Sequence, residues 1–338
     1  MTAEVGADVA PLVGLDEIRA AAELLRGVAI RTPLVPFDPP AGALLKAESL
    51  QPIGAFKLRG AYVAIASLSP DERRRGVITY SSGNHGQGVA RAARILGAPA
   101  VVVMPSDAPA IKRARIAADG AQIVVVGPSS DERQRVAEEL AAARGLAIVP
   151  PYDDRRIIAG QGTVGLEIVE DLPDLGAVLV PIGGGGLAAG VATAVKTLRP
   201  ETRVVGVEPA LAADAQESLA AGVIARWPAE AVSRTIADGT RTQSLGAITF
   251  AHLQVHLDAI VTVSEAEIAA AVRVAAERSR LVVEPSGALA VAALAWHAEE
   301  AGLPTPAAIG AGPVVAVVSG GNVDPDAYLD YLVAPLPG

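Results

Sequence analysis

The sequence contains no cysteine among its 338 residues. This absence excludes disulfide bonds, a cysteine nucleophile and an iron–sulfur cluster held by cysteine thiolates. The 4 histidines show no paired spacing of the kind that zinc sites use, so a zinc enzyme is not expected either. Thiol chemistry and thiolate-bound metals are therefore excluded before any motif is considered.

Basic charge and long apolar runs are also scarce. The formal net charge is −9 at pH 7, which argues against nucleic acid or an anionic membrane as the main partner. No apolar stretch reaches the roughly 18 residues that a membrane-spanning helix needs. Residues 1–10 include Glu4 and Asp8 and lack the basic start of a signal peptide. We therefore expect a cytoplasmic protein that acts on a small molecule, without a membrane or nucleic-acid partner.

Aromatic residues make up only 3% of the chain, although 51% of it is hydrophobic. The core must therefore consist of Ala, Val, Leu and Ile, which suit a parallel sheet covered by helices. Strand-like apolar runs alternate with helical patterns over most of the length, as expected for βα units. Three such units follow one another between residues 76 and 150, which predicts a small parallel-sheet domain within a two-domain chain.

Small-residue loops stand where three of the strand-like runs end. These loops are residues 81–88, 183–186 and 319–322. Open α/β sheets bind ligands at such strand ends. A fourth segment, residues 52–61, places Lys57 among glycines and small side chains, which suggests an amine that approaches a flat cofactor closely. A surface lysine on an amphipathic helix is the alternative explanation for this segment.

The second loop consists of Gly183, Gly184, Gly185 and Gly186. Successive backbone N–H groups and the start of a following helix form a concave anion site where no side chain blocks the approach. No Gly-Lys-Ser or Gly-Lys-Thr follows, so this loop is not a nucleotide P-loop. We interpret it as a phosphate cradle, and the alternative is a tight turn without a ligand.

Seven motifs of the chain, taken in their order along the sequence, resemble those of the pyridoxal-phosphate enzymes of the threonine dehydratase and serine racemase family, within the tryptophan-synthase-β-like superfamily. The resemblance extends from about Leu15 to Asp324. One departure is Ala55, which stands where family members usually carry serine. The motifs are residues 54–60, 82–85, 158–163, 183–186, 237–239, 284–287 and 319–322.

The resemblance implies an α/β fold with two open, twisted, mainly parallel sheets and flanking helices. It assigns residues 1–79 and 153–338 to a large, discontinuous domain that binds the cofactor. It assigns residues 80–152 to a small, mobile domain. It also implies that the protein forms a homodimer.

For the cofactor site, the resemblance implies that Lys57 binds pyridoxal 5′-phosphate covalently and later removes the α-proton of the substrate. A lysine amine must be desolvated or close to another cation to serve in this way. Asn84 would hydrogen-bond the phenolic oxygen of the cofactor, and Ser319 its pyridine nitrogen. The glycines from Gly183 to Gly186 would hold the phosphate.

For the substrate, the hydroxyl and N–H groups around a helix start at Ser81, Ser82, Asn84 and His85 can bind an α-carboxylate. A simple helix cap is the alternative, and the two interpretations are compatible. Arg133 matches a family arginine that reaches acidic substrates, although a solvated charged face would explain it equally well.

Glu208, Ala212 and Asp214 resemble the divalent-cation site of serine racemase and related dehydratases. Two carboxylates and a backbone carbonyl suit Mg²⁺ or Ca²⁺. The alternative is a pair of exposed acids beside a strand end.

Together these features predict a pyridoxal-phosphate-dependent ammonia-lyase. Its substrate would be L-threonine, L-serine or a related β-hydroxy amino acid such as threo-3-hydroxyaspartate, converted to a 2-oxo acid and ammonia. The nearest alternative is a serine or aspartate racemase with a dehydratase side activity, in which Ser82 would be the second catalytic residue. β-Replacement, as in cysteine synthase, and a non-catalytic amino-acid-binding protein are the remaining alternatives.

Overall fold

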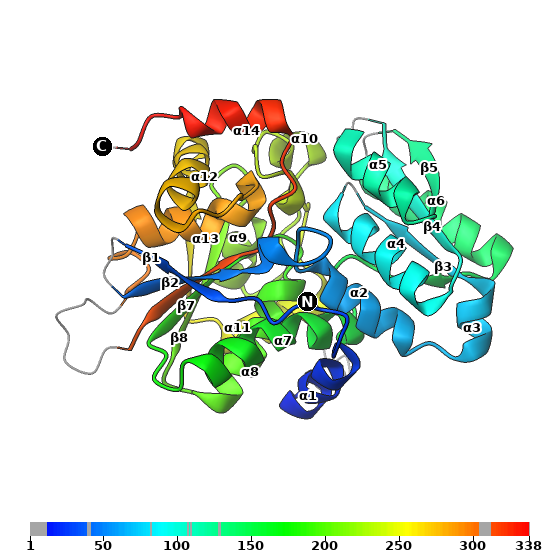
Figure 1. The fold of residues 1–338 in the computed structure, drawn as a ribbon, viewed down its shortest axis with the longest axis horizontal. Coiled ribbons are helices and arrows are strands. Elements are labelled where there is room, and N and C mark those ends of the chain that lie inside the picture. The colour runs from blue at the N-terminus through cyan, green and yellow to red at the C-terminus, as the bar shows by residue number, and fades with distance from the viewer. Residues whose placement is uncertain are drawn as a thin grey trace, which may run out of the picture.

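The computed structural model describes residues 12–38, 42–81, 83–106, 108, 110–127, 130–303 and 312–337. It contains two β-sheets that lie side by side, each covered by helices (Figure 1). The larger sheet has the strand order β1-β2-β10-β7-β8-β9 and the smaller one β5-β4-β3-β6. This architecture confirms the predicted α/β class with two mainly parallel sheets.

The larger sheet is antiparallel only where β1 meets β2. Its other neighbouring strands run parallel, and every residue of β7 and β10 is buried, as expected for strands covered on both faces. Aliphatic side chains and alanines fill both layers beside this sheet. The strands are β1 (Leu34–Phe37), β2 (Ala43–Ala47), β7 (Ala177–Pro181), β8 (Arg203–Pro209), β9 (Ala259–Val263) and β10 (Val314–Val318).

Helices cover both faces of the larger sheet (Figure 1). On one face lie α12 (Glu265–Ser279) and α13 (Pro285–Trp296), with α14 (Pro325–Leu332) packed against α12. The opposite face is covered by α1 (Leu15–Leu24), α7 (Arg155–Asp171), α8 (Gly186–Leu198) and α11 (Ala247–His256).

The smaller sheet is parallel throughout and contains the three βα units expected between residues 76 and 150. Two helices, α4 (Asn84–Leu96) and α5 (Ala110–Ala118), pack on one face, and α6 (Ser130–Arg144) packs on the other. The short strand β6 was not expected from the sequence. The domain boundaries at residues 80 and 152 stay a prediction. The strands are β3 (Val77–Tyr80), β4 (Ala100–Pro105), β5 (Gln122–Val126) and β6 (Ala147–Ile148).

Helix α2 (Lys57–Ala66) lies between the two sheets, and glycines let its backbone approach its neighbours. A Cβ atom at Gly160 of α7 would lie 2.6 Å from the Cα of Gly60. A Cβ atom at Gly88 of α4 would lie 2.9 Å from the backbone oxygen of Lys57. These contacts leave no room for a methyl group and fix the start of α2 where the sheets meet.

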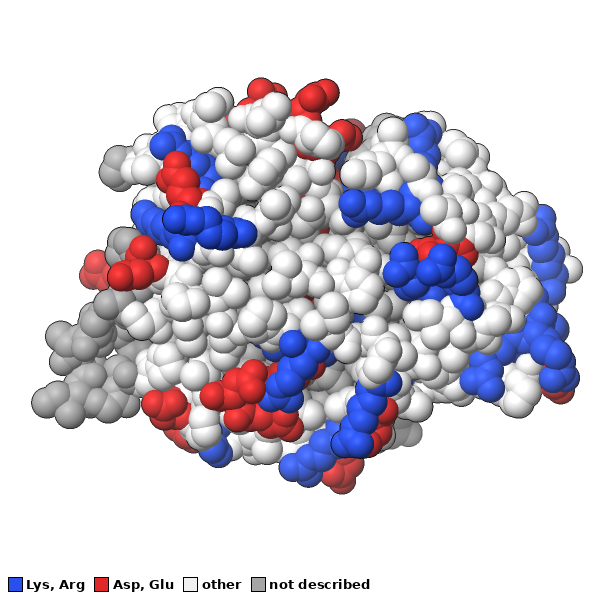
Figure 2. All heavy atoms as spheres, in the orientation of Figure 1, with Lys and Arg blue, Asp and Glu red and all other residues white. Residues whose placement is uncertain are grey.

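The remaining elements are short connections: α3 (Pro70–Arg75), α9 (Asp214–Ala221), α10 (Ala229–Val232) and 3-10 turns at Glu48–Leu50 and Asp238–Thr240. Over the described ranges, every helix is too short or too polar to traverse a bilayer. On the face shown in Figure 2, basic and acidic side chains lie close together in small groups. Exposed ion pairs include those that Arg31 forms with Glu170 and Asp171.

Candidate active site

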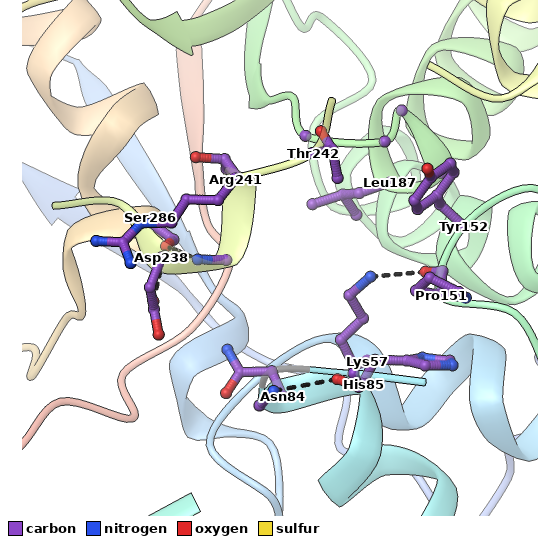
Figure 3. A pocket seen from close by; sticks show the side chains of 18 of the residues that line it. Lys57, Asn84, His85, Pro151, Tyr152, Leu187, Asp238, Arg241, Thr242 and Ser286 are labelled. Atoms are coloured by element: carbon purple, nitrogen blue, oxygen red, sulfur yellow. Dashed lines mark hydrogen bonds between the residues drawn. The ribbon is translucent and has the colours of Figure 1, made fainter. Parts of the chain in front are cut away.

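The predicted strand-end loops converge on one cavity of about 180 Å³. The larger sheet contributes the loops after β7 and β10, and the smaller sheet contributes the loop after β3 together with the start of α4. Figure 3 shows Lys57 between Asn84 and His85 on one side and Leu187 and Thr242 on the other. Loops that lie far apart in the sequence therefore line the same cavity.

Lys57, the first residue of α2, extends into this cavity. Its Nζ donates a hydrogen bond to the backbone oxygen of Pro151 at 2.7 Å (Figure 3). Burial of the amine lowers its pKa from the usual 10.5 to about 8. A substantial fraction of this amine is therefore neutral, and nucleophilic, near physiological pH.

The other lysines differ from Lys57 in their partners. The chain has only four lysines, Lys46, Lys57, Lys112 and Lys196. Lys46, Lys112 and Lys196 each form an ion pair with a carboxylate oxygen that lies within 2.7 Å of the amine. Among the described residues, Lys57 has no such ion pair. The structure thus leaves one lysine suited to act as a nucleophile or base.

The four-glycine turn joins β7 to α8. A Cβ atom at Gly184 would lie 2.1 Å from the ring of Tyr152, and Gly185 has a φ of +91°, which favours glycine. Gly186 begins the 13-residue helix α8, whose N-terminus carries partial positive charge. The hydroxyl of Thr242 lines the same cavity, is buried and has no hydrogen-bond partner among the described residues. This combination of N–H groups, helix start and free hydroxyl suits a bound phosphate.

The predicted carboxylate site lies at the start of α4. Ser81 accepts hydrogen bonds from the backbone N–H groups of Gly83 and Gly86, at 3.1 and 3.0 Å, so it caps this helix. It also lines the cavity, and the cap and binding interpretations therefore remain compatible. Ser82 lies outside the described residues.

His85 is buried beside Lys57 and is held in one orientation. One ring nitrogen, Nε2, lies 3.0 Å from the backbone oxygen of Val149 and must donate to it, because a carbonyl only accepts. The other nitrogen, Nδ1, is buried without a partner among the described residues. Burial and the nearby Lys57 lower the pKa of His85 to about 3, so the ring is neutral at physiological pH.

Ser319 and Arg133 both line the cavity, as the sequence predicted for them. The Ser319 hydroxyl donates to the backbone oxygen of Ser286 at 3.3 Å, at the end of β10. Arg133 comes from α6 on the smaller sheet, and its position at the cavity supports the interpretation as a substrate contact over that of a solvated face.

Four further polar residues of the cavity were not singled out from the sequence. Lys112 donates to Asp238 at 2.5 Å and lies 3.5 Å from Glu284. Burial raises the pKa of Glu284 to about 7, although Lys112 opposes this shift. Tyr152 packs on the glycine turn. Asp238 and Glu284 stand in recognised motifs, but nothing local distinguishes Lys112 or Tyr152 from ordinary surface residues.

The predicted cation site lies elsewhere, at the end of β8. Glu208 and Asp214 are almost fully buried, with exposures of 0% and 1%, so the alternative of two exposed acids is wrong. Glu208 accepts the N–H groups of Ala215 and Gln216 at 3.0 and 2.8 Å. Both carboxylate oxygens of Asp214 are buried without a partner among the described residues. Ala212, between the two acids in sequence, is also buried.

Burial makes ionisation of both carboxyl groups unfavourable. Burial and the neighbouring Asp214 raise the pKa of Glu208, and burial raises the pKa of Asp214 to about 7. Across the described ranges, no cluster of three or more His, Cys, Asp or Glu residues suits a metal. A cation here would therefore need backbone carbonyls or water to complete its coordination.

Comparisons with known proteins agree with this geometry. The model of a family described as pyridoxal-phosphate dependent enzyme matches residues 25–320. The chain is 42% identical over 283 residues to the L-threo-3-hydroxyaspartate ammonia-lyase of Saccharomyces cerevisiae, which covers 84% of this chain and 83% of that protein. The crystal structure of a threonine deaminase from T.th. matches with a TM-score of 0.84 and 45% identity, over 92% of this chain and 99% of that one. Maize serine racemase matches with a TM-score of 0.88 and 35% identity, over 95% and 97% of the two chains.

Proposed function

Because this chain belongs to the family of pyridoxal-phosphate dependent enzymes, we propose that it is an ammonia-lyase acting on a β-hydroxy amino acid. The proposed substrates are L-threonine, L-serine or threo-3-hydroxyaspartate, and the products are a 2-oxo acid and ammonia. Similarity to a hydroxyaspartate ammonia-lyase and to a threonine deaminase supports this assignment.

The observation that carries the proposal is that one cavity contains both the amine of Lys57 and the four-glycine turn. Pyridoxal phosphate needs an amine for its aldehyde and an anion site for its phosphate. Lys57 fits the first need, and Gly183 to Gly186 with the unpartnered hydroxyl of Thr242 fit the second. Asn84 and Ser319 would then hold the phenolic oxygen and the ring nitrogen.

When bound, the cofactor supplies an aldehyde that captures the amino group of the substrate and a ring that withdraws electrons from the α-carbon. We assign the removal of the α-proton to the neutral amine of Lys57. The start of α4, with Ser81 and His85, would bind the α-carboxylate, and Arg133 would contact a second acidic group. The neutral His85 ring uses its one N–H to donate to Val149, so its Nδ1 can only accept, and the backbone N–H of His85 at the helix start would serve the carboxylate. After the α-proton and the β-hydroxyl are lost, the released enamine hydrolyses in water to the products.

The proposal can be tested with the purified holoenzyme and a small substrate panel. L-Threonine, L-serine and threo-3-hydroxyaspartate would be supplied separately, with ammonia, 2-oxo acid and both product enantiomers quantified. We expect 2-oxo acid to be the main product from at least one of them. Absence of product from all three would overturn the proposed activity.

The lowered pKa of Lys57 leads to a prediction for cofactor capture. Only the neutral amine attacks an aldehyde, and it becomes the major form as the pH rises through about 8. Cofactor-free protein should therefore bind pyridoxal phosphate about tenfold faster at a pH one unit above this midpoint than at a pH one unit below it. Stopped-flow absorbance would measure the rate. A midpoint near 10.5 would show that burial does not activate this amine.

Ser82 separates the proposed lyase from a racemase of the kind that the maize relative represents. Racemisation needs a proton donor on the cofactor face opposite the lysine, and Ser82 is the candidate. We predict that Ser82→Ala abolishes any minor D-isomer formation, whereas elimination from the L-substrate changes less than about tenfold, because Lys57 removes the proton. Chiral chromatography would measure both products. Faster formation of D-amino acid than of 2-oxo acid by the unmodified protein would favour the racemase.

We also propose that Glu208, the carbonyl of Ala212 and Asp214 bind Mg²⁺ or Ca²⁺. Chelator should then lower the free energy of unfolding, by about 2.7 kcal/mol relative to protein at a cation concentration of roughly 100 times its Kd. Added Mg²⁺ or Ca²⁺ should restore the loss in a thermal or urea unfolding assay. Glu208→Gln is the control, since it should be insensitive to chelator. A variant that responds like the unmodified protein would place the cation elsewhere.

Two further proposals concern assembly and motion. We propose that residues 80–152 move as a small domain over the cavity, since α4, α5 and α6 supply one of its sides.

We also propose that the protein forms a homodimer. Leu50 and Val282, which are 46% and 51% exposed, lie in segments that meet at Gly321 and offer an apolar surface. Light scattering in solution would establish the oligomeric state.

A further inference from the structure

Four polar side chains form a continuous hydrogen-bonded chain that ends at the cavity. Arg115 donates to Asn322, Asn322 to Asn84 and Asn84 to Glu284. Arg115 and Asn84 come from helices beside the smaller sheet, whereas Asn322 and Glu284 belong to the larger one. Each of the three links therefore joins the two halves of the molecule.

The direction of this chain is fixed at both ends. Arginine can only donate, so its contact with Asn322 must be to the amide oxygen. The Nδ2 of Asn322 then donates to the backbone oxygen of Ile53 at 2.8 Å and to the Oδ1 of Asn84 at 2.9 Å. A backbone oxygen can only accept, which independently fixes the same orientation.

The orientation of Asn84 follows from its two neighbours. Its Oδ1 accepts from Asn322, and its Nδ2 donates to Oε1 of Glu284. An amide nitrogen carries two hydrogens, and Glu284 is the only acceptor of Nδ2 among the described residues. The second N–H is thus left for a ligand in the cavity that Asn84 lines.

Glu284 has an environment that suits this task. Its exposure is 1%, and it forms the N-cap of α13. Its Oε1 faces Asn84, and its Oε2 lies 3.5 Å from Nζ of Lys112. Oε2 has no hydrogen-bond partner among the described residues, so Oε1 is the acceptor that ends the chain.

Two glycines provide the space for these contacts. A Cβ atom at Gly320 would lie 2.1 Å from Oε1 of Glu284. A Cβ atom at Gly54 would lie 2.3 Å from Oδ1 of Asn322, and Gly54 also has a φ of +74°. The motifs that contain these glycines thereby accommodate the side chains that orient Asn84.

We propose that Glu284 is a positioning residue that fixes the Asn84 amide with a free N–H toward the phenolic oxygen of the cofactor. This inference rests on the proposed function, because it assigns the cavity to pyridoxal phosphate. It also makes the contact depend on both halves of the molecule, since Asn84 reaches the carboxylate only when the smaller sheet is in place.

The test compares four variants of the full-length protein. Glu284→Leu removes the acceptor while Asp238 still pairs with Lys112, and Asn322→Asp replaces the donor to Asn84 by a second acceptor. We expect both to alter the visible absorption band of the bound cofactor and to raise its dissociation constant about tenfold, as for the loss of one hydrogen bond. Glu284→Gln retains an acceptor oxygen and should keep the spectrum of the unmodified protein. Asp258→Asn, which removes a carboxylate paired with Lys196 outside the cavity, is the control for lost charge.

The outcomes separate the inference from its premise. If Glu284→Leu and Asn322→Asp both bind cofactor with unchanged spectrum and affinity, the positioning role is overturned. The positioning role is also overturned if Glu284→Gln behaves like Glu284→Leu. The charge or the packing of Glu284 would then explain the effect without its acceptor oxygen. If Glu284→Leu does not fold, Asn322→Asp decides the question alone. Unmodified protein that shows no cofactor band at all would instead overturn the proposed function.

Discussion

Replacement of Lys57 by alanine is expected to lower kcat by about a thousandfold or more and to abolish covalent retention of pyridoxal phosphate. Its amine is the one among the described lysines without a carboxylate partner, and burial lowers its pKa to about 8. Lys112, the other lysine that lines the cavity, forms an ion pair with Asp238. Steady-state assays and the visible spectrum of the variant would measure both losses.

Borohydride reduction of the holoenzyme followed by peptide mapping gives a direct control. With only four lysines, the label has four possible positions, and we expect it on Lys57. Lys196→Ala is the matched variant, since Lys196 pairs with Asp258 at 2.7 Å away from the cavity and should not affect cofactor binding. A label on Lys46, Lys112 or Lys196 would contradict the assignment.

Arg59→Met should lower the free energy of unfolding by about 3–5 kcal/mol. Arg59 is 1% exposed and binds both Glu48 and Glu167, at 2.8 and 2.6 Å. Burial opposes ionisation of Glu48, but the charge of Arg59 overcomes it and holds the Glu48 pKa below the usual value. Without the guanidinium, the carboxylate of Glu48, which has 0% exposure, keeps hydrogen bonds from Thr32 and Gln51 but loses its ion-pair partner. Urea denaturation would measure the change.

Two companion variants test whether the stranded charge causes this loss of stability. Arg26→Met removes a surface ion pair, Arg26 to Glu23, and exposed pairs contribute about 0–1 kcal/mol. The double variant Arg59→Met with Glu48→Gln should recover part of the loss, because it removes the stranded charge. A single variant as stable as the unmodified protein would show that the network contributes only packing.

The sequence sufficed where a local pattern has one physical explanation. Four consecutive glycines after an apolar strand indicate a close backbone approach, and the structure gives Gly185 a φ of +91° and Gly184 a contact with Tyr152. The parallel sheets followed from alternating βα patterns and from a core almost without aromatic residues. Roles that depended on the resemblance, such as that of Ser82, stay predictions.

Residues that act through distant partners escaped sequence analysis. Lys112 and Asp238 are 126 positions apart, and Asn84 and Glu284 are 200 apart. In sequence, Lys112 is one of several charged residues on a short helix, and only the meeting of the two sheets buries it. From the sequence, Glu208 and Asp214 also fitted a pair of exposed acids beside a strand end, because burial is a property of the whole fold.

The two sheets contribute different residues to the lining of the cavity. The larger half carries the glycine turn and Ser319, whereas Ser81, His85 and Arg133 come from the smaller half. With the proposed roles, changes in the smaller half would alter which amino acid is bound and would leave the glycine turn and Ser319 unchanged. Residues 77–148 would then be the part of the chain to vary for a new specificity, with the contact from Asn84 to Glu284 kept.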